Sequence, residues 1–470
     1  MSSLRICDRS EVAQHSSRKS CWVIINQIVY DFTSYVDAHP GGPQAILTYG
    51  GRDATEAFEP IHPSDTLEKH IKPESIVGRV KTPRPVQDAT RESNAASEIP
   101  PRKMRLSSIV NLTDFEVAAS ERLSARAFAF IRAGADDEKT EQWNRDSWQL
   151  VRFRPRILRP IESIDLSTTI MGAPVSVPFF IAPAGGGKLA HSSGEVLMTQ
   201  AAAKYGVLHW VCNMASCTQE DMAQARVANQ TQYWQIYAKA DLAVTEKEVR
   251  RAIELGYKGF ALTVDAIRAG KRSRDLRMAV TEYEATYPEE NEDEDDSPMS
   301  GGVSAQRGAL WSSFDWQAAI KWLRGLTDLP IAIKGIQCWE DAVLCTNYGV
   351  HPWLSNHGGR QLEGAPSAVE TLIKIRRHAP RVFNKAEVIV DGGVMRGTDV
   401  VKAIALGAKG VAIGRAFLYA LALGEVGVSK AIQILKSEME TCMSLLGVTR
   451  IEDLNVSHVT VRQATVSSHL

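Results

Sequence analysis

The chain has 470 residues, of which 44% are hydrophobic and 23% charged, so it is long enough for two or three globular domains. Its net charge of -1 and the lack of any apolar run of about 18 residues predict neither a nucleic-acid partner nor a membrane span. The seven cysteines are scattered without a C-x-x-C pair, which indicates free thiols in a reducing compartment and excludes a disulfide framework.

The first 80 residues carry two histidines in an apolar, turn-rich setting. A strand-like stretch at 21–33 precedes His39-Pro40-Gly41-Gly42, and His62 follows His39 by 23 residues. The Pro-Gly-Gly turn would let the backbone pass close to a flat ligand. Two neutral imidazoles that face each other would fill both axial positions of a haem iron, which leaves an electron carrier that does not bind oxygen. The apolar side chains that could line the pocket are Phe32, Val36, Ile46, Leu47, Phe58 and Ile71.

Either histidine taken alone is typical of a surface residue near a turn. Together, the HPGG turn at 39–42 and the segment GGRDATEAFEPIH at 50–62 resemble the cytochrome b5 family, and the resemblance covers residues 5–80. It implies that His39 and His62 are the axial ligands of a b-type haem with a one-electron role.

Residues 81–105 are polar, rich in proline, serine and alanine, and nearly free of large apolar side chains, which predicts a linker between domains at 1–80 and 106–470. In the larger domain, eight short apolar runs alternate with helix-length spacers, as buried parallel strands do. The predicted strands lie at 178–185, 207–214, 232–238, 259–266, 330–335, 351–359, 387–393 and 410–415. Pro352 predicts a late start for the sixth. The predicted fold class is α/β, a (β/α)8 TIM barrel preceded by a small α+β domain.

Polar or small residues end most of these runs, and the strand ends of a barrel share one rim, where active sites lie. One or two polar strand ends would have a purely structural explanation, but a ring of lysine, histidine, arginine and two aspartates does not. The residues of this ring include Asn213, Tyr237, Asp265, Lys334, His357, Asp391 and Arg415. We therefore predict an active site at the rim.

The larger domain resembles the family of FMN-dependent 2-hydroxy-acid oxidases and dehydrogenases over residues 108–460. The segments that carry the resemblance are LTVDAIRAGKR (262–272), SNHGGRQL (355–362), DGGVMRGTDV (391–400) and LGAKGVAIGR (406–415). With the b5-like domain in front, the order resembles the fungal flavocytochrome b2 type. This implies FMN-dependent oxidation of an L-2-hydroxy acid to the 2-oxo acid, with electrons passing through haem to an external acceptor such as cytochrome c. The family also implies a homotetramer.

The chemistry of such an oxidation gives each polar rim residue a role. His357 is the candidate base beside the flavin, and Asp265 would hold its imidazole. Arg360 and Arg272 would bind the substrate carboxylate, because a guanidinium group matches a carboxylate. Tyr237 would hydrogen-bond the substrate, and Lys334 would place a positive charge beside reduced flavin.

Donors at the last two strands suit the phosphate of FMN, and Asp391 suits a ribityl hydroxyl. The residues expected to line FMN, several of them only by the resemblance, are Ala182, Pro183, Ala184, Gly185, Cys212, Gln235, Thr263, Lys334, Asp391, Gly392, Gly393, Val394, Met395, Gly414 and Arg415.

Three positions depart from the family pattern. Phe130 stands where a tyrosine hydroxyl would touch the substrate carboxylate, and Gly185-Gly186-Gly187 replace bulkier residues, which predicts a wider pocket. Both changes favour a 2-hydroxy acid larger than lactate. Met395 stands where an arginine would help to hold phosphate, although Arg396 follows it.

Two alternatives stay open beside a haem-coupled dehydrogenase. One is an oxidase of the same fold that uses oxygen, and the other is a haem redox module with an inactive barrel. The acidic run at 288–296 is typical of a solvated loop, and docking of a basic electron acceptor is the alternative for it. Ser468-His469-Leu470 resembles a peroxisomal address, so we expect a peroxisomal or cytoplasmic protein, and the acid-containing N-terminus disfavours a mitochondrial presequence.

Overall fold

The computed structural model describes residues 4–39, 42–80, 103–286 and 310–462. Four predictions fall partly or wholly outside the described residues. They concern Pro40-Gly41, most of the 81–105 linker, the acidic run at 288–296 and the C-terminal Ser468-His469-Leu470. In the part of the chain that is described, no helix combines the length and apolar character that a membrane crossing needs.

The small N-terminal domain is built on a five-stranded sheet with the strand order β1-β5-β4-β3-β2. Its strands are β1 (Ile6–Cys7), β2 (Ser16–Ser17), β3 (Ser20–Ile25), β4 (Ile28–Asp31) and β5 (Ile76–Val80). The expectation of one strand-like stretch at 21–33 was wrong, because Asn26 and Gln27 have positive φ angles of 50° and 67° and turn the chain back into an antiparallel hairpin.

Short helices pack against this sheet. They are α1 (Arg9–Ala13), η1 (Val36–Ala38), α2 (Pro43–Leu47), α3 (Thr55–Phe58), α4 (Thr66–His70) and η2 (Pro73–Ser75). Val12 of α1 belongs to a different buried cluster from Val23 and Ile25. The side chains of Val23, Ile25, Phe32, Val36 and Ile46 form the buried core on the side of the sheet that faces His39 and His62. The helices around His39 and His62 are too short to be stable by themselves, so they depend on apolar contacts with this small core.

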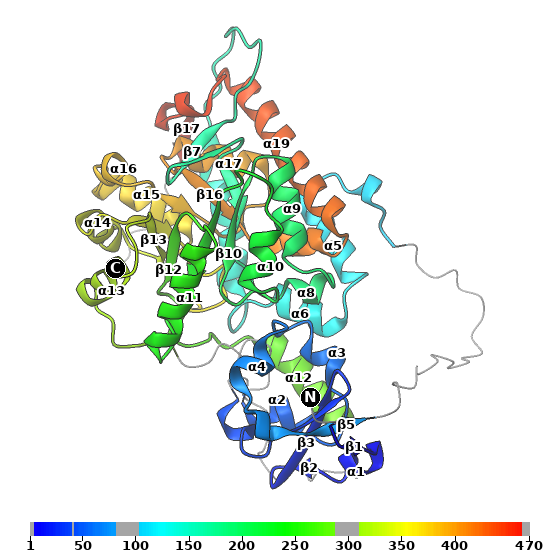
Figure 1. Cartoon of the computed structure of the whole chain (residues 1–470). Helices are drawn as coiled ribbons and strands as arrows, with labels where there is room; N and C mark the ends of the chain where they lie inside the picture. Colours follow the sequence, from blue (N-terminus) through cyan, green and yellow to red (C-terminus); the bar gives the residue numbers. More distant parts are fainter. Residues whose placement is uncertain (1–3, 40–41, 81–102, 287–309, 463–470) are drawn as a thin grey trace, which may run out of the picture.

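The larger domain is a closed parallel barrel with the order β10-β11-β12-β13-β14-β15-β16-β9, which confirms the predicted fold class and all eight strands (Figure 1). The strands are β9 (Phe179–Ile181), β10 (Leu208–Cys212), β11 (Gln232–Ile236), β12 (Phe260–Thr263), β13 (Ile331–Ile336), β14 (His351–Leu354), β15 (Ile389–Val390) and β16 (Gly410–Ile413). The late start of the sixth strand was wrong: β14 begins at His351. Pro352 is tolerated there because β15 pairs only with Trp353 and Leu354.

Helices follow the strands of the barrel. They are α8 (Gly187–Ala190), α9 (Val196–Lys204), α10 (Gln219–Gln224), α11 (Leu242–Glu254), α12 (Ser273–Thr286), α13 (Trp316–Arg324), α14 (Trp339–Asn347), α15 (Ala368–His378), α16 (Val382–Lys385), α17 (Gly397–Ala405), α18 (Arg415–Leu421) and α19 (Glu425–Leu446). Apart from α12, they lie around the barrel (Figure 1). Serine, threonine or aspartate caps several of their N-termini, as Ser367 does for α15.

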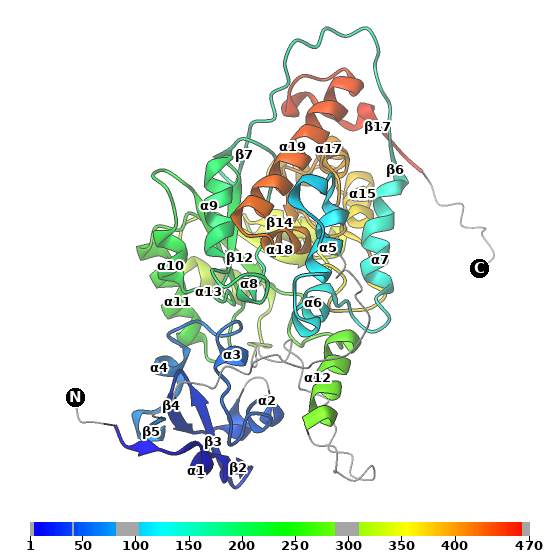
Figure 2. The same cartoon turned by 90° about the vertical axis from the view of Figure 1, so that its right-hand side faces the viewer.

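Further elements flank the barrel in sequence. They are η3 (Leu106–Ser108), α5 (Leu112–Ser120), α6 (Ala125–Arg132), α7 (Lys139–Asp146), η4 (Ser147–Leu150), β6 (Val151–Phe153), β7 (Thr168–Ile170), β8 (Ala173–Val175), η6 (Ile451–Asp453), η7 (Val456–His458) and β17 (Val459–Val461). Helices α5 to α7 lie beside the barrel, and the ends of α6 and α7 reach the rim (Figure 2).

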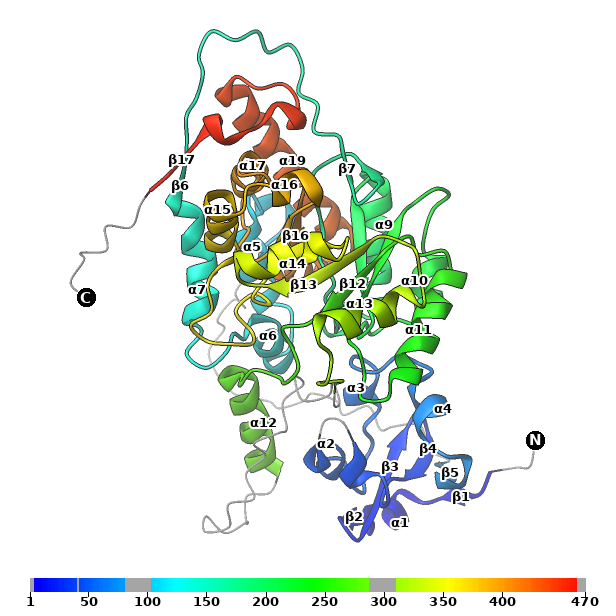
Figure 3. The same ribbon diagram turned by 90° about the vertical axis from the view of Figure 1, so that its left-hand side faces the viewer.

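The small domain lies against the carboxyl-end rim of the barrel. Its helices α3 and α4 face α8, α6 and α11, and α12 extends from the barrel beside the small domain (Figures 1, 2 and 3). This arrangement places the segment that holds His62 next to the carboxyl ends of the barrel strands, where the active site was predicted.

Candidate functional site

The polar strand ends gather around one cavity of about 250 Å³, called here the rim cavity. Of the predicted catalytic residues, Tyr237, Arg272, Lys334, His357 and Arg360 line it, and Asp265 lies behind His357. All fifteen residues expected to line FMN also line this cavity: Ala182, Pro183, Ala184, Gly185, Cys212, Gln235, Thr263, Lys334, Asp391, Gly392, Gly393, Val394, Met395, Gly414 and Arg415.

His357 lies between a buried carboxylate and a phenol. Its Nδ1 is 2.9 Å from Oδ1 of Asp265, whose side chain is 1% exposed, and its Nε2 is 3.2 Å from the hydroxyl of Tyr237. Because a carboxylate accepts hydrogen bonds, Asp265 keeps the proton of neutral His357 on Nδ1 and leaves the lone pair on Nε2. The atom that faces Tyr237 is therefore the one able to accept a proton.

The backbone holds His357 in a conformation that non-glycine residues seldom adopt. Its φ is 61°, and its backbone N–H donates to Oγ of Ser355 at 3.0 Å. Such strain persists only where the surroundings fix it, and it concentrates at functional sites. Here it turns the imidazole out of the direction of β14 and toward Asp265.

Two arginines provide positive charge beside the histidine. Arg360 donates through Nη1 to the carbonyl oxygens of Phe130, Ile131 and Ala133 at the end of α6. Burial, together with the nearby Arg272 and Arg415, lowers the pKa of Arg360, although a guanidinium group stays charged in proteins. An incoming carboxylate would relieve the repulsion among these cations, which makes this side of the cavity an anion site.

Lys334 supplies a buried charge at the floor of the cavity. Its Nζ donates to Oγ of Ser355 at 3.0 Å and lies 3.5 Å from Oδ2 of Asp391. Burial by itself would lower the pKa of Lys334, but the carboxylates of Asp391 and Asp265 outweigh burial and raise it. Lys334 is therefore a permanent cation in the rim cavity.

Two buried acceptors in the cavity fit the polar edge of a flavin. Oε1 of Gln235 and Oδ1 of Asp391 have no hydrogen-bond partner within the described residues. Gln235 is oriented by its own hydrogen bond, from Nε2 to Oγ1 of Thr263 at 2.8 Å. Buried polar atoms normally find partners, and the ring N–H and ribityl hydroxyls of FMN are such donors. Together with Arg415 at the strand-eight end, these residues fit FMN.

The expected widening by three glycines was only partly right. A Cβ on Gly185 would lie 2.3 Å from the carbonyl oxygen of Met214, and one on Gly187 would lie 2.6 Å from Cδ of Glu195. These two glycines therefore permit close packing and do not empty the cavity. A Cβ on Gly186 would lie 3.3 Å from the Phe130 ring, so the change in shape is confined to that pair.

The phosphate end of the cavity lacks the cation that the family resemblance implies at position 395. Met395 lines the cavity, but Arg396 does not, since its side chain is 50% exposed and paired with Glu438. Sequence reasoning also missed Glu141 and Arg145, which reach the cavity from α7. No sequence signal marks them, because α7 precedes the first barrel strand and its place on the rim is a tertiary feature.

A second cavity of about 500 Å³, called here the interdomain cavity, lies between the small domain and the barrel. His39 and His62 line it, with ring centroids 6.2 Å apart. Two metal–imidazole bonds of about 2 Å plus the radii of the rings give roughly this separation. Four of the predicted apolar residues, Phe32, Ile46, Phe58 and Ile71, line the cavity, whereas Val36 and Leu47 pack behind it.

Backbone carbonyls orient both histidines. Nδ1 of His62 lies 3.2 Å from the Phe58 carbonyl oxygen, and Nδ1 of His39 lies 3.4 Å from that of Gly42. Such a bond places the proton on Nδ1 and leaves Nε2 to bind a metal. Burial lowers the pKa of His62 to about 4 and also lowers that of His39, so both rings are neutral at neutral pH. The pair fits a six-coordinate haem.

The two cavities adjoin. Ile61, between the two helices α3 and α4, and Met214, after β10, line both the rim cavity and the interdomain cavity. A thin apolar partition from both domains therefore separates the FMN site from the haem site.

Comparison with known proteins supports both modules. The FMN-dependent dehydrogenase family matches residues 119–461, and the cytochrome b5-like haem/steroid binding domain matches residues 8–81. The L-lactate dehydrogenase (cytochrome) of Wickerhamomyces anomalus is 40% identical over 449 residues, 94% of this chain and 78% of that protein. A peroxisomal (S)-2-hydroxyacid oxidase of Arabidopsis thaliana is 39% identical over 366 residues, 77% of this chain and 99% of that protein.

Among solved structures, the flavin-binding domain of baker's yeast flavocytochrome b2 superposes with a TM-score of 0.69 at 35% identity, over 78% of this chain and 91% of that one. The closed barrel, the flavin-fitting cavity and the paired histidines agree with these matches. The chain is a member of the FMN-dependent dehydrogenase family, an oxidoreductase that carries FMN in its barrel and haem in an N-terminal cytochrome b5-like domain.

Proposed function

We propose that the chain oxidises an L-2-hydroxy acid to the 2-oxo acid in the rim cavity and passes the electrons through haem to an external acceptor such as cytochrome c. The observation that carries this proposal is the Asp265–His357–Tyr237 arrangement, with Nε2 of His357 facing a cavity lined by Arg272 and Arg360. It combines a base with a carboxylate-binding site, which is what a 2-hydroxy acid requires.

Each polar residue of the rim cavity has a role that follows from its charge. Arg360 and Arg272 bind the carboxylate and thereby set the position of the Cα–OH group. His357 accepts at Nε2 the proton that the substrate releases, and buried Asp265 stabilises the resulting imidazolium. FMN, when bound, supplies the two-electron acceptor. Lys334 offsets negative charge at the cavity floor, where the nearest carboxylate is Asp391.

The adjoining cavities favour transfer to haem over release of electrons to oxygen. Ile61 and Met214 are shared by the two linings, so the FMN and haem sites are separated by little more than these side chains. His39 and His62 would hold the haem, which would supply a one-electron carrier. The oxidase alternative is kept because the Arabidopsis relative that covers the barrel is named as an oxidase.

Anaerobic rapid mixing of the holoprotein with 2-hydroxy acids tests the proposal. Flavin bleaching followed by haem reduction is the expected result. Bleaching that only air reverses would favour the oxidase. An absence of bleaching with every acid would contradict both the dehydrogenase and the oxidase hypotheses.

For the substrate class, we propose an acid with a side chain longer than that of lactate. Phe130 offers an apolar ring instead of a hydroxyl, and Ile61, Leu189 and Met214 extend the apolar lining. Burying one more methylene is worth about 0.8 kcal/mol, and a few of them outweigh one hydrogen bond to a charged group. A chain-length series of kcat/KM is the test, and a maximum at lactate or glycolate would contradict the proposal.

Assembly and compartment are also proposals. We propose a homotetramer, because the family resemblance implies one, and a peroxisomal or cytoplasmic location, because Ser468-His469-Leu470 resembles a peroxisomal address. Sedimentation of the holoprotein and imaging of a protein tagged at its N-terminus would test them. A monomer, or a signal in mitochondria, would contradict them.

A further inference from the structure

The phosphate end of the rim cavity lacks one cation that the sequence resemblance leads one to expect. Met395 follows the β15 end and contributes an apolar side chain to the lining. The next residue, Arg396, is 50% exposed and donates to Glu438, away from the cavity. Among the described residues at the ends of β15 and β16, Arg415 is therefore the one cation that lines the cavity beside Gly393 and Gly414.

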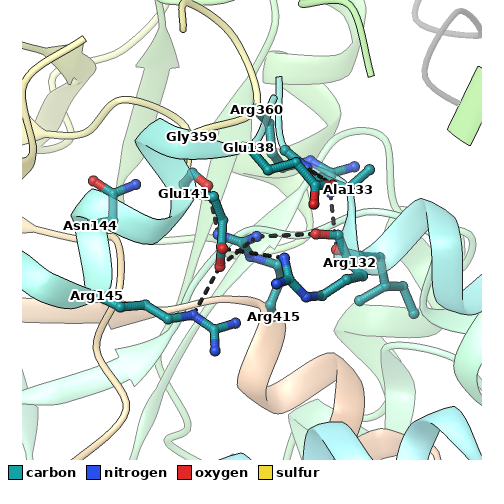
Figure 4. Close-up of polar contacts among 12 residues, drawn as sticks. Arg132, Ala133, Glu138, Glu141, Asn144, Arg145, Gly359, Arg360 and Arg415 are labelled. Atoms are coloured by element: carbon teal, nitrogen blue, oxygen red, sulfur yellow. Dashed lines mark hydrogen bonds and ion pairs between the residues drawn. The ribbon is translucent and has the colours of Figure 1, made fainter. Parts of the chain in front are cut away.

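A different helix brings a second arginine to this place. Arg145, on α7, lines the rim cavity together with Arg415, Gly393 and Gly414. Both arginines reach the same carboxylate oxygen, Oε1 of Glu141, from Nε of Arg145 at 2.9 Å and from Nη1 of Arg415 at 3.2 Å (Figure 4). The two guanidinium groups are therefore neighbours across one buried acid.

Close backbone packing fixes α7 against the strand-seven loop. A Cβ on Gly393 would lie 2.0 Å from the carbonyl oxygen of Asn144, so only glycine permits this approach. The indole N–H of Trp148 donates to the carbonyl oxygen of Gly392 at 3.1 Å. Asn144 also exchanges two hydrogen bonds of 2.8 Å with Asn356, before His357. The base of the Arg145 side chain is thus anchored to the loop that should cradle a phosphate.

The cluster of arginine and glutamate side chains around Arg145 carries a net positive charge. Arg132 pairs with Glu116 at 2.7 Å and with Glu141 at 3.2 Å, and Arg145 pairs with Glu116 at 3.1 Å. Three guanidinium groups, including that of Arg415, thus face two carboxylates, which leaves one net positive charge. Of these three guanidinium groups, those of Arg145 and Arg415 line the cavity and that of Arg132 does not, so Arg145 and Arg415 are the ones that an anion in the cavity would meet.

We propose that Arg145 is a second binding residue for the phosphate monoester of FMN, acting with Arg415 in place of the cation that position 395 lacks. The proposal rests on FMN binding in the barrel and is independent of which acid is oxidised or which acceptor takes the electrons. Guanidinium N–H groups suit phosphate oxygens, and the pairs with Glu141 and Glu116 hold the guanidinium of Arg145 in place.

Flavin affinity with and without the phosphate tests the proposal. The full-length protein is stripped of flavin and titrated with FMN or with riboflavin, which lacks the phosphate, while quenching of flavin fluorescence is measured. In Arg145→Gln, the Kd for FMN should rise about 10- to 100-fold, the size of a lost hydrogen bond to a charged group. The Kd for riboflavin should stay within about twofold of wild type, because riboflavin does not make the contact.

Arg132→Gln is the matched control, because Arg132 pairs with the same two glutamates but does not line the cavity. Arg132→Gln removes a charge from the cluster but no cavity-lining group, so its ratio of FMN to riboflavin affinity should change clearly less than that of Arg145→Gln. An equal loss of both affinities in Arg145→Gln, or an equal change of the ratio in Arg132→Gln, would overturn the proposal.

Arg145→Lys keeps the test decisive if the glutamine variant does not fold. It retains the charge but loses the planar fork, so FMN affinity should fall a few-fold while riboflavin affinity stays unchanged. Unchanged FMN affinity in this variant would overturn the proposal.

Discussion

The rim cavity and the interdomain cavity bind their cofactors on different physical terms. The rim cavity is the smaller, at about 250 Å³, and is lined by charged groups such as Lys334, Arg360 and Arg415 that are already held by protein partners. The interdomain cavity, at about 500 Å³, offers two oriented histidines in a mainly apolar slot. The first site selects by preorganised charge and the second by shape and metal ligation. The sites should therefore fail in different ways when single residues are changed.

Substitution of the haem ligands should produce the largest difference between the two cavities. His39→Ala or His62→Ala should abolish haem binding, because the apolar slot offers no other pair of imidazoles at a 6.2 Å centroid separation within the described residues. Flavin reduction by substrate should persist, while reduction of cytochrome c should be lost. Haem absorbance and stopped-flow flavin bleaching measure the two effects. A folded variant that lost FMN as well would show that the two sites are not independent.

The next effect should come from the base. His357→Gln should bind FMN normally and reduce it about 10²- to 10⁴-fold more slowly, since general-base catalysis contributes this much. Stopped-flow flavin bleaching under anaerobic conditions gives the rate, and flavin absorbance of the purified variant controls for cofactor loss. His378→Gln, on α15, is a control outside the rim cavity. A rate for His357→Gln within a few-fold of wild type would remove His357 from the proposed role.

A smaller effect, on substrate preference, is expected from Phe130 in the rim cavity. Phe130→Tyr should shift kcat/KM toward lactate and glycolate, because a new hydroxyl near Arg360, whose guanidinium carbon lies 5.2 Å from the ring centroid, can bind a carboxylate. A hydrogen bond to a charged group corresponds to about 1.5–3 kcal/mol at most, and an exposed or imperfect one to less. The ratio of kcat/KM for a long-chain acid to that for lactate measures the shift. An unchanged ratio would show that Phe130 does not touch substrate.

The smallest effect concerns an ion pair outside the cavities. Glu138 accepts hydrogen bonds from Nε and Nη2 of Arg274, and this guanidinium group is the main cause that lowers the pKa of Glu138 to about 2. Because the folded pKa lies below the ordinary value of 4.5, the stabilisation is present above pH 4.5 and is lost as pH falls toward 2. Partly exposed pairs contribute roughly 0.2–1 kcal/mol.

Glu138→Gln should therefore lower the free energy of unfolding slightly at pH 7, with a difference from wild type that shrinks below pH 4.5. Thermal unfolding at several pH values measures it. Lys436→Gln, which alters an exposed pair 3.9 Å long with Glu440, is the control and should show little change at any pH. A loss that grew with acidity would contradict the assignment.

The sequence by itself determined the elements whose signals are local. Apolar runs that end in polar residues predicted eight barrel strands and the cavity at their ends, because parallel strands buried on both faces leave only their ends polar. His39 and His62 also predicted the haem site, because they lie only 23 residues apart on either side of a turn within one short stretch of sequence. Even the hairpin at Asn26-Gln27 carried a local signal, the asparagine, that the longer strand prediction overlooked.

Only the tertiary structure decided which distant segments share a cavity. Arg145 and Glu141 reach the phosphate end from α7, about 250 residues before Gly393 in the sequence, and no periodicity or motif predicts that approach. The glycines at 185 and 187 predicted a wider pocket, and only their neighbours Met214 and Glu195 show that they permit close packing instead. Burial and ion pairing depend on neighbours brought together by folding, so the charge of a site can be predicted from its strand ends but its partners cannot.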